Sequence, residues 1–138
     1  ARATLAPAAE RCATLTFHGA GDALLAVPLG EAHARELGEH FRALLQAFAD
    51  KQAAAATGGG GGTAARHESM DFACQQGDGM RLEIFCNPNS AADAFSAAAL
   101  VTAEAPGMRG VIEVPISALK ADLETYAVAL KAQPDPQQ

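Results

Sequence analysis

Two histidines and a carboxylate, His33, Glu36 and His40, lie in one short segment, and these residue types are common ligands of divalent metals. On a helix, all three fall on one strip beside the apolar face. The histidines, however, are seven residues apart, about 10 Å along the helix axis. The HExxH metal motif places them four apart, and a metal binds each histidine nitrogen at about 2 Å. The spacing therefore favours a solvated helix flank, with Glu36 paired to His40, over a metal site.

The other histidines and the cysteines have no partner at a recognised spacing. His18 ends an alternating segment, and His67 follows a glycine-rich stretch. Cys12, Cys74 and Cys86 are odd in number and form no CxxC pair, so neither a disulfide framework nor a zinc site is expected. Cys74 and Cys86 are expected on a core face, and Cys12 is the thiol expected to be exposed.

The hydroxyl and acidic side chains also lack a catalytic pattern. Ser117 lies outside any GxSxG motif and is interpreted as a helix cap. A carboxylate pair or cation site remains an alternative for four acidic residues of the second half, but a solvated acidic face that steers a basic partner is favoured. These residues are Glu104, Glu113, Asp122 and Glu124. No residue is therefore predicted to be catalytic, cofactor-binding or metal-binding.

Composition allows a single domain with a modest core. The chain has 138 residues, of which 49% are hydrophobic, but 34 of these are alanine. Leu, Ile, Val and Phe together make up 20% of the chain, near the level below which a highly charged chain is disordered. The large apolar residues are clustered and the net charge is only −6, so residues 1–138 are expected to fold as one unit.

Charge and hydropathy disfavour several classes of partner. Residues 70–138 carry a net charge of −5, and no basic stripe is available for phosphate contacts, so nucleic-acid binding is not expected. No run of about 20 apolar residues could span a membrane. No signal peptide is recognisable, so a cytoplasmic location is favoured while the compartment stays open.

The first half has the pattern of a hairpin followed by a helix. Residues 13–18 alternate as a half-buried strand, and residues 23–29 form a second strand that Pro28 is expected to end. From Glu31, apolar residues recur every three or four positions, which predicts an amphipathic helix extended by alanines to Gly58. The glycine run that follows predicts a flexible linker over residues 57–66.

The second half begins with a hairpin whose register is set by its apolar pattern. A three-residue loop, 77–79, with Gly79 left-handed, pairs Cys74 with Leu82 and puts every apolar residue on one face. Cys86 then lies about 13 Å from the position opposite Cys74, too far for a disulfide.

The remainder predicts a third hairpin, 100–105 with 109–116, and a closing helix that carries Leu119, Leu123, Tyr126 and Leu130 on one face. Residues 90–99 remain open between a short helix capped by Ser90 and a strand that starts at Phe95. The tails, 1–11 and 133–138, are expected to be disordered. The predicted fold is α+β, in the order ββα-linker-ββ-ββα: an antiparallel sheet of six strands with two helices on one face.

Because no catalytic set emerges, the predicted function is a small non-enzymatic acidic module. It is expected to bind a protein partner or a second copy of itself through a sheet edge, the open sheet face or the acidic surface. The alternative is a ligand-binding or metal-binding domain, or an enzyme, with its site between the two halves. Neither rests on a resemblance to a known family.

Overall fold

The computed structural model describes residues 10–56, 68–77, 79–91, 94 and 96–134. The expected linker (57–66), His67 and most of both expected tails lie outside these residues. Of the first tail, Glu10 and Arg11 are described, and both bond to the start of the following helix: Glu10 Oε2 accepts from Ala32 N at 3.1 Å, and Arg11 O accepts from Glu31 N at 2.9 Å. Gly30 at this helix start has no side chain to cap it, so Glu10 supplies the capping oxygen.

The class and the order of elements are those expected: α+β, with six antiparallel strands and two helices. The elements are β1 (Cys12–His18), β2 (Leu24–Gly30), α1 (Glu31–Ala56), β3 (Met70–Gln75), β4 (Arg81–Cys86), the 3-10 turn η1 (Pro88–Ser90), β5 (Ala98–Ala105), β6 (Met108–Pro115) and α2 (Ile116–Lys131). No helix in the described ranges is both long enough and apolar enough to cross a membrane.

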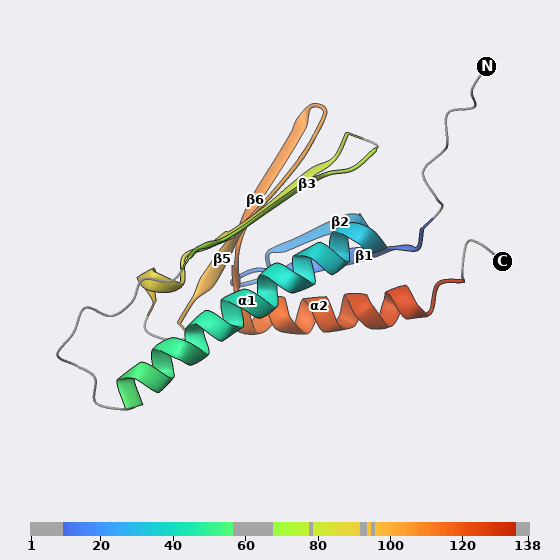
Figure 1. Ribbon diagram of the computed structural model, residues 1–138. Helices are drawn as coiled ribbons and strands as arrows, with labels where there is room; N and C mark the ends of the chain where they lie inside the picture. Colours follow the sequence, from blue (N-terminus) through green and yellow to red (C-terminus); the bar gives the residue numbers. More distant parts are fainter. Residues whose placement is uncertain (1–9, 57–67, 78, 92–93, 95, 135–138) are drawn as a thin grey trace, which may run out of the picture.

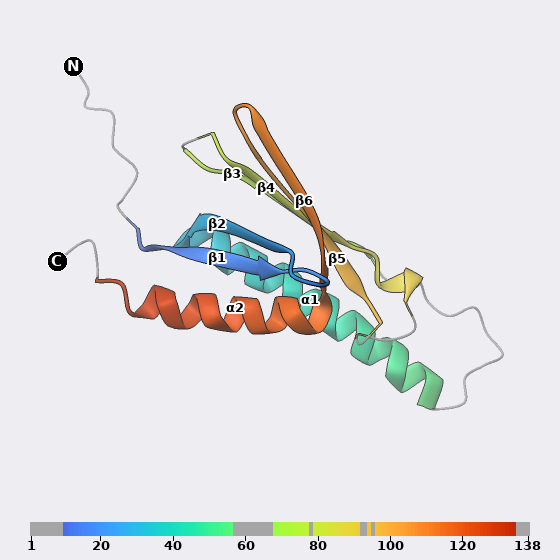
Figure 2. The ribbon, with the colours of Figure 1, turned by 180° about the vertical axis from the view of Figure 1, so that it is seen from behind.

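The expectation of one six-stranded sheet is wrong, because the strands form two sheets. β1 pairs with β2 alone, and β3, β4, β5 and β6 form a separate sheet in that order. Figure 1 shows the four-stranded sheet inclined to the β1–β2 hairpin, and Figure 2 shows the same arrangement from behind. Two side chains, described below, bond backbone groups on the outer edges of the hairpin where a further strand would otherwise pair.

The register predicted for the β3–β4 hairpin is confirmed. Cys74 pairs with Leu82, and Phe72 pairs with Ile84. Gly79 has φ +90°, as a left-handed loop position requires. The buried residues of both strands share one face, so the apolar alternation determined the register.

The prediction that Pro28 ends the second strand is wrong, since β2 continues to Gly30 and Pro28 lies opposite Thr14. The hairpin bonds Gly19 N to Ala23 O and Glu31 N to Arg11 O. Both of these bonds join odd-numbered residues. Because bonded and non-bonded pairs alternate in an antiparallel ladder, the even-numbered residues of β1 and β2 direct their backbone N–H and C=O groups outward, away from the partner strand. Pro28 is one of these, and its missing N–H costs no ladder bond.

Gln76, directly after β3, binds the outward edge of β2. Its Nε2 donates to Pro28 O at 2.5 Å, and its Oε1 accepts from Gly30 N at 3.2 Å. One side-chain amide therefore takes the place that a neighbouring strand would occupy, and it joins β2 to the end of β3.

The closing helix begins without a side-chain cap, so the interpretation of Ser117 as its cap is wrong. The N-cap residue is Pro115, and Ile116 N donates to Ala97 O at 3.1 Å. This backbone bond continues the pairing of Ala98 with Pro115. The β5–β6 ladder thus supplies the acceptor for the first helical N–H.

The sequence left residues 90–99 open. In the structure this segment begins with Ser90, the last residue of η1, and ends in strand β5, which starts at Ala98. Neither alternative fits it fully, because the 3-10 turn ends at Ser90 and the strand starts three residues after Phe95, which is itself outside the described residues. Lys51 of α1 holds η1 by donating to Pro88 O at 2.6 Å and to Ala91 O at 2.5 Å.

The core lies between the helices and the inner faces of both sheets. It includes Phe17, Leu37, Phe72 and Leu119, all fully buried. Both views show α1 and α2 side by side and running in opposite directions (Figures 1 and 2). The first half contributes α1 and the second half contributes α2, so the two halves face each other across the helix pair.

Replacement of Gln76 by alanine should lower the free energy of unfolding by about 1–2 kcal/mol, because Pro28 O and Gly30 N lose their partner. Gln75→Ala is the matched control, since Gln75 is exposed on the outer face, and it should change stability by less than about 0.5 kcal/mol. Urea denaturation of both variants measures the difference. Equal losses would contradict the proposed role of Gln76.

Candidate functional site

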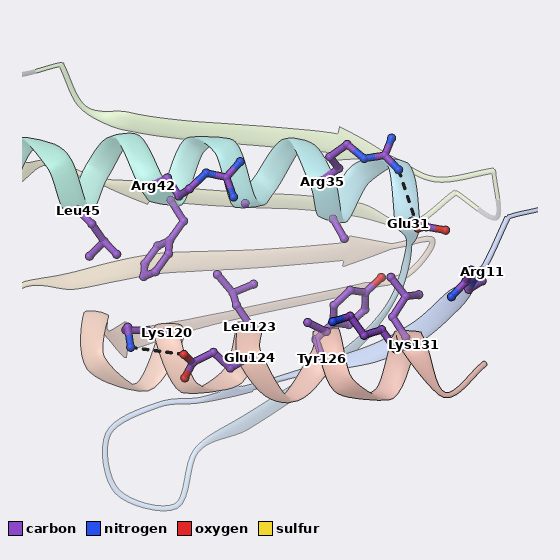
Figure 3. Close-up of a pocket in the computed structure, with 15 residues that line it drawn as sticks. Arg11, Glu31, Arg35, Arg42, Leu45, Lys120, Leu123, Glu124, Tyr126 and Lys131 are labelled. Atoms are coloured by element: carbon purple, nitrogen blue, oxygen red, sulfur yellow. Dashed lines mark hydrogen bonds and ion pairs between the residues drawn. The ribbon is translucent and has the colours of Figure 1, made fainter. Parts of the chain in front are cut away.

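A groove of about 570 Å³ runs between α1 and α2, and its size is that of a ligand site. Figure 3 shows α1 along one wall and α2 along the other, with side chains from both directed between them. Within the described part of the chain, every lining residue except Arg11 comes from these two helices.

The floor of the groove is apolar. Phe41 and Tyr126 lie at its base and are buried, with 6% and 4% of their surface exposed. Leu45, Leu123 and Leu130 are only half-buried. These three belong to the apolar stripes recognised in the sequence, and the groove is where the stripes of the two helices do not fully cover each other.

The rim of the groove is strongly basic. It carries five of the ten Lys and Arg residues of the chain and two acidic residues, a formal charge of +3 in a protein of net −6. The cations are Arg11, Arg35, Arg42, Lys120 and Lys131. A dense basic rim over an apolar floor selects ligands that are apolar on one side and negatively charged at their flanks.

Two of the cations are partly neutralised by acids of their own helix. Arg35 Nη2 lies 3.9 Å from Glu31 Oε2, and Lys120 Nζ lies 3.4 Å from Glu124 Oε2, as the dashed lines in Figure 3 mark. In the part of the chain that the structure describes, the other three cations form no ion pair, which leaves their charge available to a ligand.

Gly38 widens the groove in the middle of α1. Glycine in a helix interior is destabilising by about 1 kcal/mol relative to alanine. A glycine here therefore indicates that the space which a side chain would fill is needed. A β-carbon at this position would meet only Arg42 Nη1, at 3.7 Å. The absence of a side chain keeps this section of the wall low.

Tyr126 fixes the floor to the first hairpin. Its hydroxyl donates to Leu29 O at 2.6 Å, and burial raises the pKa of the phenol. The raised pKa keeps the hydroxyl protonated, so it acts as a donor that ties α2 to β2 rather than as an acid or base.

Asp122 is the exception to the predicted solvated acidic face, because it is buried between α2 and β1. Its Oδ2 accepts from the backbone N–H of His18 at 2.9 Å, and its Oδ1 accepts from His18 Nδ1 at 2.6 Å. His18 N–H is one of the outward groups of β1, so Asp122 occupies this edge as Gln76 occupies the edge of β2. Glu104, Glu113 and Glu124 are not buried.

A buried carboxylate that holds an imidazole also orients the base in some hydrolases. The pair does not line the groove. Among the described residues, His18 bonds only to Asp122, although 57% of its side chain is exposed. We therefore assign the pair a structural role.

His33, Glu36 and His40, which were weighed as metal ligands from the sequence and disfavoured, form no metal-binding group in the structure. Within the described ranges no group of three or more His, Cys, Asp or Glu could hold a metal ion. His40 presents its ring to the edge of Phe72, with centroids 5.6 Å apart. This contact, rather than the proposed pairing with Glu36, explains the position of His40 on the flank of the helix.

Cys12, Cys74 and Cys86 form no disulfide with one another, as expected, and Cys74 and Cys86 are buried. Burial raises the pKa of both buried thiols. A raised thiol pKa lowers the fraction of reactive thiolate, so both are expected to react more slowly than an exposed thiol.

The groove was not predicted from the sequence, because it depends on how two helices that are 60 residues apart in the sequence lie relative to each other. One signal was present: Arg35, Arg42 and Gly38 border the apolar stripe of the first helix. Asp122 could also have been recognised, since it lies three residues after Leu119 on the same helical stripe as Leu123 and Tyr126.

Replacement of Asp122 by alanine should destabilise the protein by about 2–4 kcal/mol, because a buried charged acceptor of two bonds is lost and the His18 N–H has no partner. His18→Ala keeps the backbone bond and should cost about 1 kcal/mol. Glu124→Ala, at an exposed position of the same helix, is the control and should have little effect. If Asp122→Ala were no worse than the control, the edge contact would not stabilise the fold.

Iodoacetamide should alkylate Cys12 in the native protein and Cys74 and Cys86 only after unfolding, since Cys12 is exposed and the other two are buried. Intact-mass spectrometry with and without urea counts the modified thiols. If Cys74 and Cys86 were alkylated in the native protein as fast as Cys12, the two thiols would not be buried, and the prediction would be wrong.

Comparisons with protein-family models, with curated proteins and with solved structures find no match for this chain. The function must therefore be inferred from the geometry and charge of the groove itself.

Proposed function

We propose that this protein is a non-enzymatic protein-binding module, and that the groove between α1 and α2 binds an apolar segment of a partner protein that carries acidic side chains. One observation carries the proposal: half of the basic residues of an acidic chain surround a single apolar groove. Such a concentration opposes the overall charge, and complementary charge gives specificity for an acidic ligand.

The sequence alone predicted a protein partner at a sheet edge, at the open sheet face or on an acidic surface, and the acidic surface could steer a basic partner. The rim of the groove has the opposite sign, and its apolar floor supplies the contact area that a charged surface lacks. Association gains most of its free energy from apolar burial, while charges set the orientation and the choice of partner. The proposal therefore keeps the expected protein partner, but the partner's binding segment is acidic rather than basic.

The alternative, an enzyme or metal site between the halves, shares this location, because α1 and α2 belong to different halves. Among the described residues, however, the groove lining contains no histidine, cysteine or serine. The carboxylates of this lining, Glu31 and Glu124, face Arg35 and Lys120 of their own helices. This set supports binding rather than acid–base or nucleophilic chemistry.

The proposal also keeps the expected layered arrangement, with both helices on the inner side and the outer face of the four-stranded sheet open. That outer face exposes Phe85, Leu100 and Val111. They alternate with charged residues such as Asp71 and Glu113, and nothing in the structure indicates what would cover them. We therefore place the function in the groove and not on this face.

The test compares two variants that change net charge equally. Arg42→Gln with Lys131→Gln removes two unpaired groove cations, and Arg81→Gln with Arg109→Gln removes two cations of the outer sheet face. Proteins that the wild type retains from a cell lysate are first identified and purified. The Kd of each partner is then measured with the wild type and with both variants. The groove variant should weaken binding at least fivefold, and the control less than twofold.

Two results would contradict the proposal. One is a purified partner whose affinity falls equally with both variants. The other is a partner whose backbone amide shifts, measured on isotope-labelled protein, map to the outer sheet face rather than to α1 and α2.

A further inference from the structure

The proposed function leaves open the form of the bound segment, and this inference rests on that function. We infer that the occupant is an amphipathic α-helix of three to four turns, with an apolar stripe against the floor of the groove and acidic side chains on both flanks. Three observations carry the inference: the backbone of the walls, the distribution of the cations and the length of the floor.

The two helical walls offer few backbone partners to a bound peptide. Of the lining residues that the structure describes, all except Arg11 lie in α1 or α2, whose interior N–H and C=O groups are bonded within each helix. An extended peptide would face an apolar floor with unpaired backbone groups, and each would lose its hydrogen bonds to water. A helical peptide satisfies its own backbone, so the groove selects a helix.

The cations are spread along both walls rather than gathered at one point. Arg35 and Arg42 lie seven residues apart on α1, about 10 Å along its axis, and Lys120 and Lys131 lie about 16 Å apart on α2. An acyl chain with a single carboxylate can meet one of them. Only a ligand with several acidic groups along its length matches both rows, and a helix with acids on each flank of its apolar stripe has that distribution.

The length of the groove matches a short helix. The lining runs from Glu31 to Leu45 on α1 and from Lys120 to Lys131 on α2, fourteen and eleven residue steps, or about 21 Å and 16 Å. About eleven to fourteen residues of a third helix, three to four turns, cover that distance. Two antiparallel helices with a half-buried apolar seam are the surface on which an amphipathic helix docks.

Gly38 provides a steric test without a change of charge. Only Arg42 Nη1 lies within 4 Å of a β-carbon at this position, so Gly38→Leu should fold, fill the groove and exclude a helix. Ala49→Leu, at an exposed position of α1 that does not line the groove, is the matched control.

Three fifteen-residue peptides serve as probes, each titrated into isotope-labelled full-length protein. The first has leucine at helical spacing and glutamate on both flanks. The second has the same composition, reordered so that leucine and glutamate alternate as in a strand. The third is the first with lysine in place of glutamate. Dodecanoate is a fourth probe for the acyl alternative.

The first peptide should shift the amide resonances of α1 and α2, gain helicity by circular dichroism and bind at least tenfold more tightly than each of the other probes. Gly38→Leu should weaken it at least tenfold, and Ala49→Leu less than twofold. Unchanged chemical shifts of core residues such as Leu119 establish that Gly38→Leu remains folded.

Four results overturn the inference: no binding of the first peptide, equal or tighter binding of the strand-ordered peptide, tighter binding of dodecanoate, or a dimer in light scattering that Gly38→Leu converts to a monomer. These results would refute the bound helix, and they can be told apart from results that refute the groove as the binding site. A natural partner that still depends on Arg42 and Lys131 but binds in extended form would refute the helix and leave the groove as the binding site.

Discussion

Polar side chains from distant segments bind the outer edges of the two-stranded sheet, and these contacts link it to the rest of the protein. β1 and β2 direct half of their backbone polar groups away from each other, and an unpaired group buried from water is costly. Gln76 bonds two of these groups on β2, and Asp122 bonds one at the end of β1. Each is a side chain from a distant segment. The hairpin is therefore placed against β3 by one contact and against α2 by the other.

The position of α2 has a direct consequence for the groove. Asp122 and Tyr126 lie one turn apart on α2 and bind β1 and β2 respectively. Both bonds direct one face of α2 toward the hairpin, and α1 is held separately through its own core contacts. The helices are thus positioned by the strands beneath them rather than by each other, which leaves Leu123 and Leu130 half-covered along their seam.

Local pattern was sufficient to predict most of the elements. The alternation of Phe72 and Cys74 with polar neighbours determined the β3–β4 register, and the apolar spacing from Leu37 to Phe48 determined the helix. Prediction failed where a residue acts through a distant partner. Pro28 was taken as a strand end because the outward direction of its backbone depends on register. Asp122 was taken as solvated because its partner, His18, is 104 residues away. The groove depends on two helices from different halves, and no local pattern reports their separation.

The contact between His18 and Asp122 also bears on how the chain folds. The strands of the first hairpin are neighbours in sequence, but the carboxylate that pairs the edge of β1 belongs to α2. Contacts of such long sequence separation form late and slow folding, because the intervening chain must be ordered first. The outward N–H of His18 therefore stays unpaired until α2 docks against the β1–β2 hairpin. Because an open strand edge can pair with another copy of the chain, the docking of α2 also protects this edge from self-association.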